Sequence, residues 1–144
     1  KQVSVIVRDL KMIQRYCEVT VAAQKIIQKY LHGAVTIILP VKPDINLEQP
    51  TLGIRIPDTP FTKAFSGILE TPYTATSANV SGEPVIYASQ DIKSNLLGGK
   101  FKPDLFLDAG ILPKNPPSTV LDLTQNPPQI LRHGSVKIGI RDLS

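Results

Sequence analysis

The segment TLGIRIPD contains the first residues with the chemistry to bind a ligand. Within it, Thr51, Gly53 and Arg55 alternate with apolar residues, and side chains two positions apart on a β-strand point to the same face. An arginine that points inward from such a strand requires an anion. Its guanidinium either pairs with a carboxylate of the protein, such as that of Asp58, or holds the carboxylate or phosphate of a ligand through two parallel hydrogen bonds. The spacing leaves both interpretations open.

A second polar cluster lies in the segment TATSANVSGEP, where an apolar strand ends. Consecutive small polar residues make a poor strand but a suitable ligand loop. Ser77 and Asn79 share a side, which brings a hydroxyl and an amide group to one phosphate or ribose, while neighbouring backbone NH groups supply further donors. An ordinary turn stabilised by serine and asparagine side chains is the alternative interpretation.

Two further segments place polar side chains beside a strand. In PPSTVLDL, Ser118 and Thr119 follow two prolines, and hydroxyl groups on so stiff a backbone lose little entropy when they bind a ligand. In ILRHG, Arg132 ends a short strand before Gly134. Taken alone, these two segments indicate only a turn and a surface arginine.

Several familiar motifs are absent from the sequence. It contains no GxxxxGK[ST] or GxGxxG phosphate loop and no GxSxG nucleophile turn. His32 and His133 have no evident nucleophile as a partner. Because Cys17 is the only cysteine, a disulfide framework and a His/Cys zinc site are excluded. The sequence therefore predicts no metal ligands and assigns no catalytic residue.

The composition is that of a globular protein. The 144 residues, 42% of them apolar and 19% charged, suffice for one domain with a substantial core, and no apolar run is long enough to span a bilayer. The net charge of +4 is concentrated before His32, which is compatible with a nucleotide or RNA partner or with a solvated helix face. The single cysteine and the lack of a secretory leader favour the cytoplasm.

Thirteen prolines and nine glycines divide the chain into short elements. Strands are expected at residues 3–7, 35–39, 53–56, 73–77, 105–107, 119–123 and 129–131. Helices are expected after Asp9 through Gln14, after Thr20 as far as Gly33 in the left-handed stop position, after Thr59, and over 89–97. The inward side chains of the second and third helices are expected to be Val21, Ile26, Ile27 and Tyr30, and Phe61, Ala64, Phe65 and Ile68. This order predicts an α/β fold with a mixed, twisted sheet covered by helices.

Six segments, taken in order, resemble the YrdC-like family of threonylcarbamoyl-AMP synthases. They are GAVTIILP, LGIRIPD, TSANVSG, DLFLDAG, PSTVLDLT and ILRHG, and they cover nearly the whole chain. The resemblance implies a YrdC-like α/β fold, whose twisted mixed sheet encloses a central basic cavity. It also implies a nucleotidyltransferase, L-threonylcarbamoyladenylate synthase, which forms threonylcarbamoyl-AMP and pyrophosphate from L-threonine, bicarbonate and ATP for the threonylcarbamoyladenosine modification of tRNA.

The same resemblance implies two sets of binding residues. The residues for L-threonine are Arg55, Ala75 through its backbone, and Ser118. The residues for ATP, which would bring Mg²⁺ with it, are Lys1, Thr51, Ser77, Asn79, Val85 and Arg132. Members of the family are also linked to RNA, so tRNA or double-stranded RNA is a further expected partner.

The sequence departs from the family at its start. The family's threonine loop and its KxR basic pair have no counterpart, so we expect residues 1–144 to form a single YrdC-like domain that lacks its N-terminal segment. Ile6 stands where many members carry a histidine that contacts threonine. Two other functions stay open: a non-catalytic, RNA-binding relative associated with translation, and a module that handles a carbamoyl-adenylate within a maturation enzyme.

Overall fold

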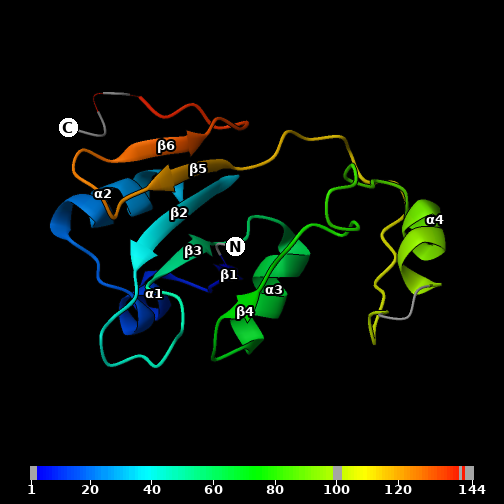
Figure 1. The fold of residues 1–144 in the computed structure, drawn as a ribbon, viewed down its shortest axis with the longest axis horizontal. Coiled ribbons are helices and arrows are strands. Elements are labelled where there is room, and N and C mark those ends of the chain that lie inside the picture. Colours follow the sequence, from blue (N-terminus) through cyan, green and yellow to red (C-terminus); the bar gives the residue numbers. More distant parts are fainter. Residues whose placement is uncertain (1–2, 99–101, 140, 142–144) are drawn as a thin grey trace. The chain divides into compact units, whose positions relative to one another are not determined.

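The computed structural model of the protein describes residues 3–98, 102–139 and 141 (Figure 1). The chain divides into two compact units, one formed by residues 1–75 with 116–144 and the other by residues 76–115. The first unit contains the β-sheet and the apolar core. The second consists of loops and one short helical segment.

The first unit is built on a six-stranded mixed sheet. Its described elements are β1 (Ser4–Ile6), α1 (Leu10–Tyr16), α2 (Val21–Tyr30), β2 (Val35–Pro40), β3 (Thr51–Arg55), α3 (Pro60–Ile68), β4 (Tyr73–Thr74), β5 (Thr119–Asp122) and β6 (Gln129–Arg132). The strand order is β4-β1-β3-β2-β5-β6, with β1–β3 and β2–β5 parallel and the other pairs antiparallel. The predicted α/β fold with a mixed sheet is confirmed.

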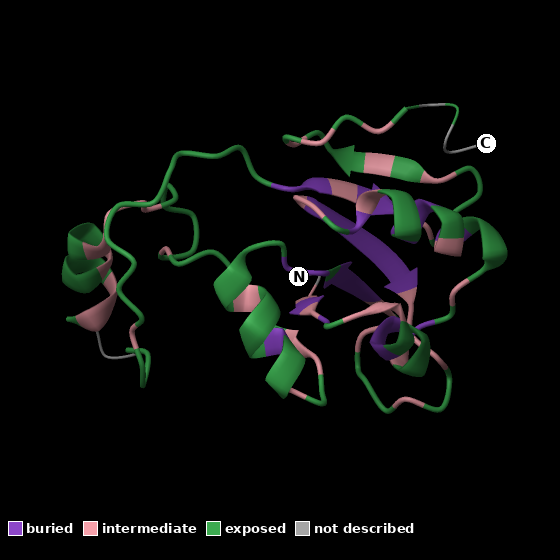
Figure 2. Cartoon of the chain, turned by 180° about the vertical axis from the view of Figure 1, so that it is seen from behind, coloured by how far each residue is buried: buried purple, intermediate pink, exposed green. Residues whose placement is uncertain are grey.

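The apolar core fills one face of this sheet. Along β2, Val35, Ile37 and Leu39 are at most 1% exposed, and Figure 2 shows the central strands in the colour of buried residues. Helices α1 and α2 cover that face with apolar side chains such as Ile13 and Ile27, which belong to the same core cluster. Each such side chain stabilises the fold by about 1.5–3 kcal/mol through burial.

The starts of α1 and α2 are fixed by side-chain caps. The Asp9 carboxylate accepts a hydrogen bond from the Met12 amide at 2.8 Å, and the Thr20 hydroxyl accepts one from the Ala23 amide at 3.1 Å. Such a cap satisfies a backbone donor that the helix itself leaves unpaired and is worth about 1 kcal/mol. The hydrogen bond from Met12 also lowers the pKa of Asp9. Both predicted caps are confirmed.

The predicted end of α2 is wrong. The helix stops at Tyr30, its C-cap Leu31 has right-handed helical angles, and Gly33 does not have a positive φ. Leu31 is fully buried, so packing of the chain into the core ends the helix before a glycine is needed. Val21 was expected to point inward but is 76% exposed, since it begins the first turn on the solvent side.

The prediction of which side chains of α3 point inward is also wrong. Phe61, Phe65 and Ile68 are 59%, 44% and 79% exposed, and Ala64 is exposed as well. The buried residue of α3 is Ser66, whose hydroxyl lies 2.9 Å from the Tyr73 hydroxyl of β4. The buried residue of α3 is therefore small and polar. The spacing of apolar residues shows which side chains share a face of the helix, but not which face meets the sheet.

The second unit contains α4 (Ser89–Ile92) followed directly by the π-helical turn η1 (Lys93–Leu97), where a short helix was predicted. The strand expected at 105–107 is not formed, because no neighbouring strand pairs with it, and the strand expected at 73–77 is limited to β4. Within residues 76–98 and 102–115 no side chain is buried. This unit therefore adds nothing to the apolar core.

No helix in the described ranges is long and apolar enough to cross a bilayer. The longest of the elements given above, α2, has 10 residues.

Cys17 should be chemically inert in the folded protein. Its side chain is 1% exposed, and burial raises the pKa of its thiol to about 11, so that roughly one thiol in a thousand is ionised at pH 8. We expect its reaction with a thiol reagent at pH 8 to be at least tenfold slower in buffer than in urea. The folded state holds the proton of the Cys17 thiol more tightly than the unfolded state does. The contribution of the protonated thiol to the stability of the fold is therefore present below about pH 8.5 and is lost as the pH rises towards 11. Equal labelling rates in buffer and urea would contradict the burial.

Candidate functional site

The face of the sheet opposite α1 and α2 carries most of the predicted binding residues. Strand β3 pairs with β2 so that Gly53 lies opposite Ile38 and Thr51 opposite Pro40. Paired residues share a face, and residues two apart along a strand do so as well. Thr51, Gly53 and Arg55 therefore stand on one face, as predicted, and it is the face without the core.

A row of side chains crosses this face from β1 to β6. Ile6 lies opposite Arg55, Thr36 opposite Val120, and Val120 opposite Arg132. Extending the register of β2 and β3 by one residue places Arg55 beside Thr36. Two arginines thus lie on the same face of the sheet with a buried threonine between them in the row. Ile6, the departure from the family pattern, belongs to the same row.

Gly53 keeps this face open at its centre. A Cβ atom at Gly53 would lie 2.9 Å from Ser4 Oγ and 3.4 Å from Thr36 Cγ2. Any side chain would therefore push against two neighbouring strands at once. The glycine therefore leaves room for the Ser4 hydroxyl and the Thr36 methyl group on this face.

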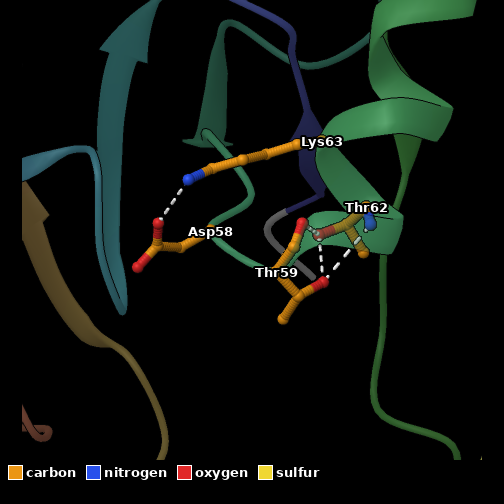
Figure 3. A network of polar contacts seen from close by, with 4 residues as sticks. All are labelled: Asp58, Thr59, Thr62 and Lys63. Carbon is orange, nitrogen blue, oxygen red and sulfur yellow. Dashed lines mark hydrogen bonds and ion pairs between the residues drawn. The ribbon is translucent and has the colours of Figure 1, made fainter.

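Arg55 has no carboxylate partner within the described residues. Asp58, the partner considered from the sequence, instead pairs with Lys63 at 2.8 Å (Figure 3). The hydrogen bond from Lys63 also lowers the pKa of Asp58. Thr59 lies between them in the sequence, where its hydroxyl caps α3 by accepting from the Thr62 amide at 3.3 Å. Among the described residues, the exposed Arg55 therefore has no anionic side chain as a partner.

Ser118 is the centre of a buried hydrogen-bond cluster. Its side chain is 7% exposed, and its Oγ lies 2.9 Å from the Oγ1 atom of Thr36 on β2. Arg132 on β6 donates from Nη2 to Ser118 Oγ and from Nε to the Ser118 carbonyl, both at 2.9 Å. Two strands far apart in the sequence therefore hold this serine from both sides.

The chain around Ser118 is fixed by its neighbour Thr119 and by Gly134. The Thr119 hydroxyl donates to the Val136 carbonyl at 2.6 Å and accepts from the Gly134 amide at 3.0 Å. A Cβ atom at Gly134 would collide with the Pro117 carbonyl oxygen and the Thr119 amide nitrogen. The glycine of ILRHG is thus required by a close approach of two backbones.

Ala75, expected to contact threonine through its backbone, follows the edge strand β4. Its amide donates to the Ser4 carbonyl at 2.9 Å, which ties it to β1. The first unit therefore brings Thr51, Arg55 and Arg132 onto one sheet, with Ala75 directly after β4 and Ser118 directly before β5.

The other residues predicted to bind ATP lie in the second unit or outside the described residues. Asn79 donates from Nδ2 to the carbonyls of Val80 and Glu83, at 3.0 and 2.7 Å, so its amide group stabilises a turn. Its Oδ1 atom is buried and has no hydrogen-bond partner among the described residues. Ser77 and Val85 are exposed. Lys1 lies outside the described residues.

Thr36 and Gly134 were not identified as site residues from the sequence. Thr36 interrupts the apolar run of GAVTIILP, and a hydroxyl inside a central strand was the signal that could have drawn attention to it. In the described part of the chain, no three histidine, cysteine, aspartate or glutamate side chains come together as metal ligands.

Comparison with known proteins identifies relatives of this arrangement. A model of the family described as Telomere recombination, which covers the Sua5, YciO and YrdC proteins, matches residues 1–134. A Methanocaldococcus jannaschii protein is 36% identical over 140 residues, which are 96% of this chain and 65% of that protein. The Schizosaccharomyces pombe threonylcarbamoyl-AMP synthase is 31% identical over 121 residues, 78% of this chain and 29% of that protein. The chain thus spans less than two thirds of the length of either relative.

Two solved structures share the fold. Escherichia coli YciO has a TM-score of 0.81 at 25% identity and is matched over 94% of this chain and 67% of that one. Pyrococcus abyssi Sua5 in complex with L-threonine has a TM-score of 0.80 at 24% identity, over 93% of this chain and 40% of that one.

The close approach at Gly134 predicts opposite effects for two glycine substitutions. Gly134→Ala should destabilise the protein by about 2 kcal/mol or more, because the new methyl group meets backbone atoms that cannot move aside. Gly67→Ala, at a helical position with open space around it, should stabilise the protein by about 0.5 kcal/mol. Urea unfolding of both variants measures the difference. Equal stability of the two variants would contradict the close packing beneath Ser118.

Proposed function

The chain belongs to the Sua5, YciO and YrdC family, and we propose that it forms threonylcarbamoyl-AMP and pyrophosphate from L-threonine, bicarbonate and ATP. One observation carries the proposal. Arg55, which has no carboxylate partner in the described part of the chain, shares a sheet face with the buried and doubly hydrogen-bonded Ser118. A cation beside fixed hydroxyl groups is the chemistry that recognises a carboxylate or a phosphate.

The proposed reaction makes two demands on such a site. The amine of threonine first adds to carbon dioxide and loses a proton, or reacts with bicarbonate with loss of water, and becomes a carbamate. A carbamate oxygen then attacks the α-phosphorus of ATP, the bond from that phosphorus to the β-phosphate oxygen breaks, and pyrophosphate leaves. Both reactants are anions, so the protein has to neutralise charge and align them without needing a nucleophile of its own. This agrees with a sequence that offers no classical catalytic residue.

Each predicted residue has a place in this scheme. Arg55 and Ser118 would hold the carboxylate of threonine, with the backbone at Ala75 nearby. Arg132 uses Nε and one N–H of Nη2 on Ser118, so its other N–H groups remain for phosphate oxygens. The other residues proposed for ATP are Lys1, Thr51, Ser77, Asn79 and Val85.

Magnesium would accompany the nucleotide. Mg²⁺ commonly binds through the substrate's phosphates and retained waters, with few protein carboxylates. The ion would neutralise phosphate charge. As part of the proposal, the product serves tRNA modification in the cytoplasm, and the basic surplus before His32 would attract RNA.

The experiment that tests this function measures pyrophosphate release while each substrate is omitted in turn. The proposal predicts release only when L-threonine, bicarbonate and ATP are all present. Replacing L-threonine and bicarbonate by carbamoyl phosphate tests the carbamoyl-adenylate alternative in the same assay. No release above the ATP-only background, from protein shown to be folded, would contradict the synthase and favour the non-catalytic relative.

Arg55→Lys should weaken the use of threonine far more than that of ATP. Lysine keeps the charge but loses the planar pair of donors that fits a carboxylate, so we expect the KM for L-threonine to rise about tenfold or more and the KM for ATP to stay within about twofold. Arg15→Lys, an exposed change on α1 away from this face, is the matched control. An unchanged threonine dependence in the Arg55 variant would refute the assignment.

Ser77→Ala should impair nucleotide binding. We expect the affinity for ATP, measured by isothermal titration, to fall roughly tenfold through the loss of one hydrogen bond to a charged group, with little effect on L-threonine. Ser81→Ala in the same exposed loop is the control. If both variants bind ATP like the parent protein, Ser77 is not a nucleotide ligand.

A further inference from the structure

We propose that Thr36 is a positioning residue, which fixes the direction in which the Ser118 hydroxyl donates its proton to the carboxylate of the bound amino acid. The inference rests on the proposed function, because there Ser118 is a ligand of L-threonine. It assigns a role to a residue that neither the polar motifs nor the family resemblance singled out.

The hydrogen bonds of Ser118 restrict what its hydroxyl can do. A hydroxyl group has one proton to donate and two lone pairs to accept with. Arginine carries donors only, so the 2.9 Å contact from Arg132 Nη2 occupies one lone pair of Ser118 Oγ. The partner at the second contact, also 2.9 Å away, is the Thr36 hydroxyl.

Two arrangements of the Thr36–Ser118 bond are possible, since either oxygen can be the donor. If Ser118 donates to Thr36, its only proton is used inside the protein and none remains for a ligand. If Thr36 donates to Ser118, both lone pairs of Ser118 are occupied and its proton must point elsewhere. A carboxylate can only accept, so binding of an amino acid through Ser118 selects the second arrangement, with Thr36 as donor.

The surroundings of Thr36 hold it in place for this role. Its side chain is 8% exposed in the central strand β2. Its methyl group lies against Gly53, where an added Cβ would approach to 3.4 Å. A β-branched side chain has few rotamers, so the contact with Gly53 and the bond to Ser118 together fix the Thr36 hydroxyl before a ligand arrives.

The test compares Thr36→Val, which keeps the shape and removes the donor, with Thr36→Ser, which keeps the donor. Isothermal titration of each variant uses L-threonine and L-threoninol, the amino alcohol that lacks the carboxylate. For L-threonine, we expect Thr36→Val to weaken binding by roughly tenfold to a hundredfold, the range for a buried hydrogen bond to a charged group. Thr36→Ser should stay within about threefold of the parent protein. L-threoninol has no carboxylate and should bind more weakly. Both variants should bind it with the same affinity as the parent protein.

A double-mutant cycle separates positioning from a general loss of structure. In a Ser118→Ala background, Thr36→Val should cause no further loss of L-threonine affinity, since there is no hydroxyl left to orient. Equal losses for L-threonine and L-threoninol, or full L-threonine affinity in Thr36→Val, would overturn the positioning role alone. Absence of L-threonine binding by the folded parent protein would instead contradict the proposed function, and the positioning role with it.

Discussion

The alternation of side chains along the two central strands is the constraint on which the rest of the structure depends. On β2, the residues at positions 35, 37 and 39 are apolar and face α1 and α2, while Thr36 and Ile38 face the other way. On β3, Leu52 and Ile54 join the core and Arg55 does not. A slip of one residue in the pairing would exchange the two faces. Burial of the apolar face therefore fixes which side chains are left to meet a ligand.

On the face of the sheet opposite α1 and α2, the hydroxyl groups of Thr36 and Ser118 are buried, which would be costly if they lacked hydrogen-bond partners. An unpaired hydroxyl in such a position costs roughly 1–3 kcal/mol, yet Thr36 and Ser118 satisfy each other and Arg132 supplies a charged donor. Gly53 and Gly134 make the close approaches possible. The donors are thus held in place by the fold itself, which is the condition for recognising an anion with little further ordering.

Local features were predictable from the sequence and distant contacts were not. The caps at Asp9, Thr20 and Thr59 were predicted correctly because a cap bonds within three residues. The shared face of Thr51, Gly53 and Arg55 followed from the period of a strand. The contact between Thr36 and Ser118 joins residues 82 positions apart, and no local pattern indicates it. For the same reason, the spacing of apolar residues in α3 did not show that Ser66 would be the one to face the sheet.

The central claim is that this face of the sheet binds the carboxylate of L-threonine between Arg55, which has no carboxylate partner among the described residues, and the hydrogen-bonded Ser118. A crystal structure of the protein with L-threonine tests it most directly. The account predicts a carboxylate oxygen within hydrogen-bond distance of Ser118 Oγ and a second interaction with the Arg55 guanidinium. L-threonine bound elsewhere, or on this face with its carboxylate in contact with neither residue, would contradict it.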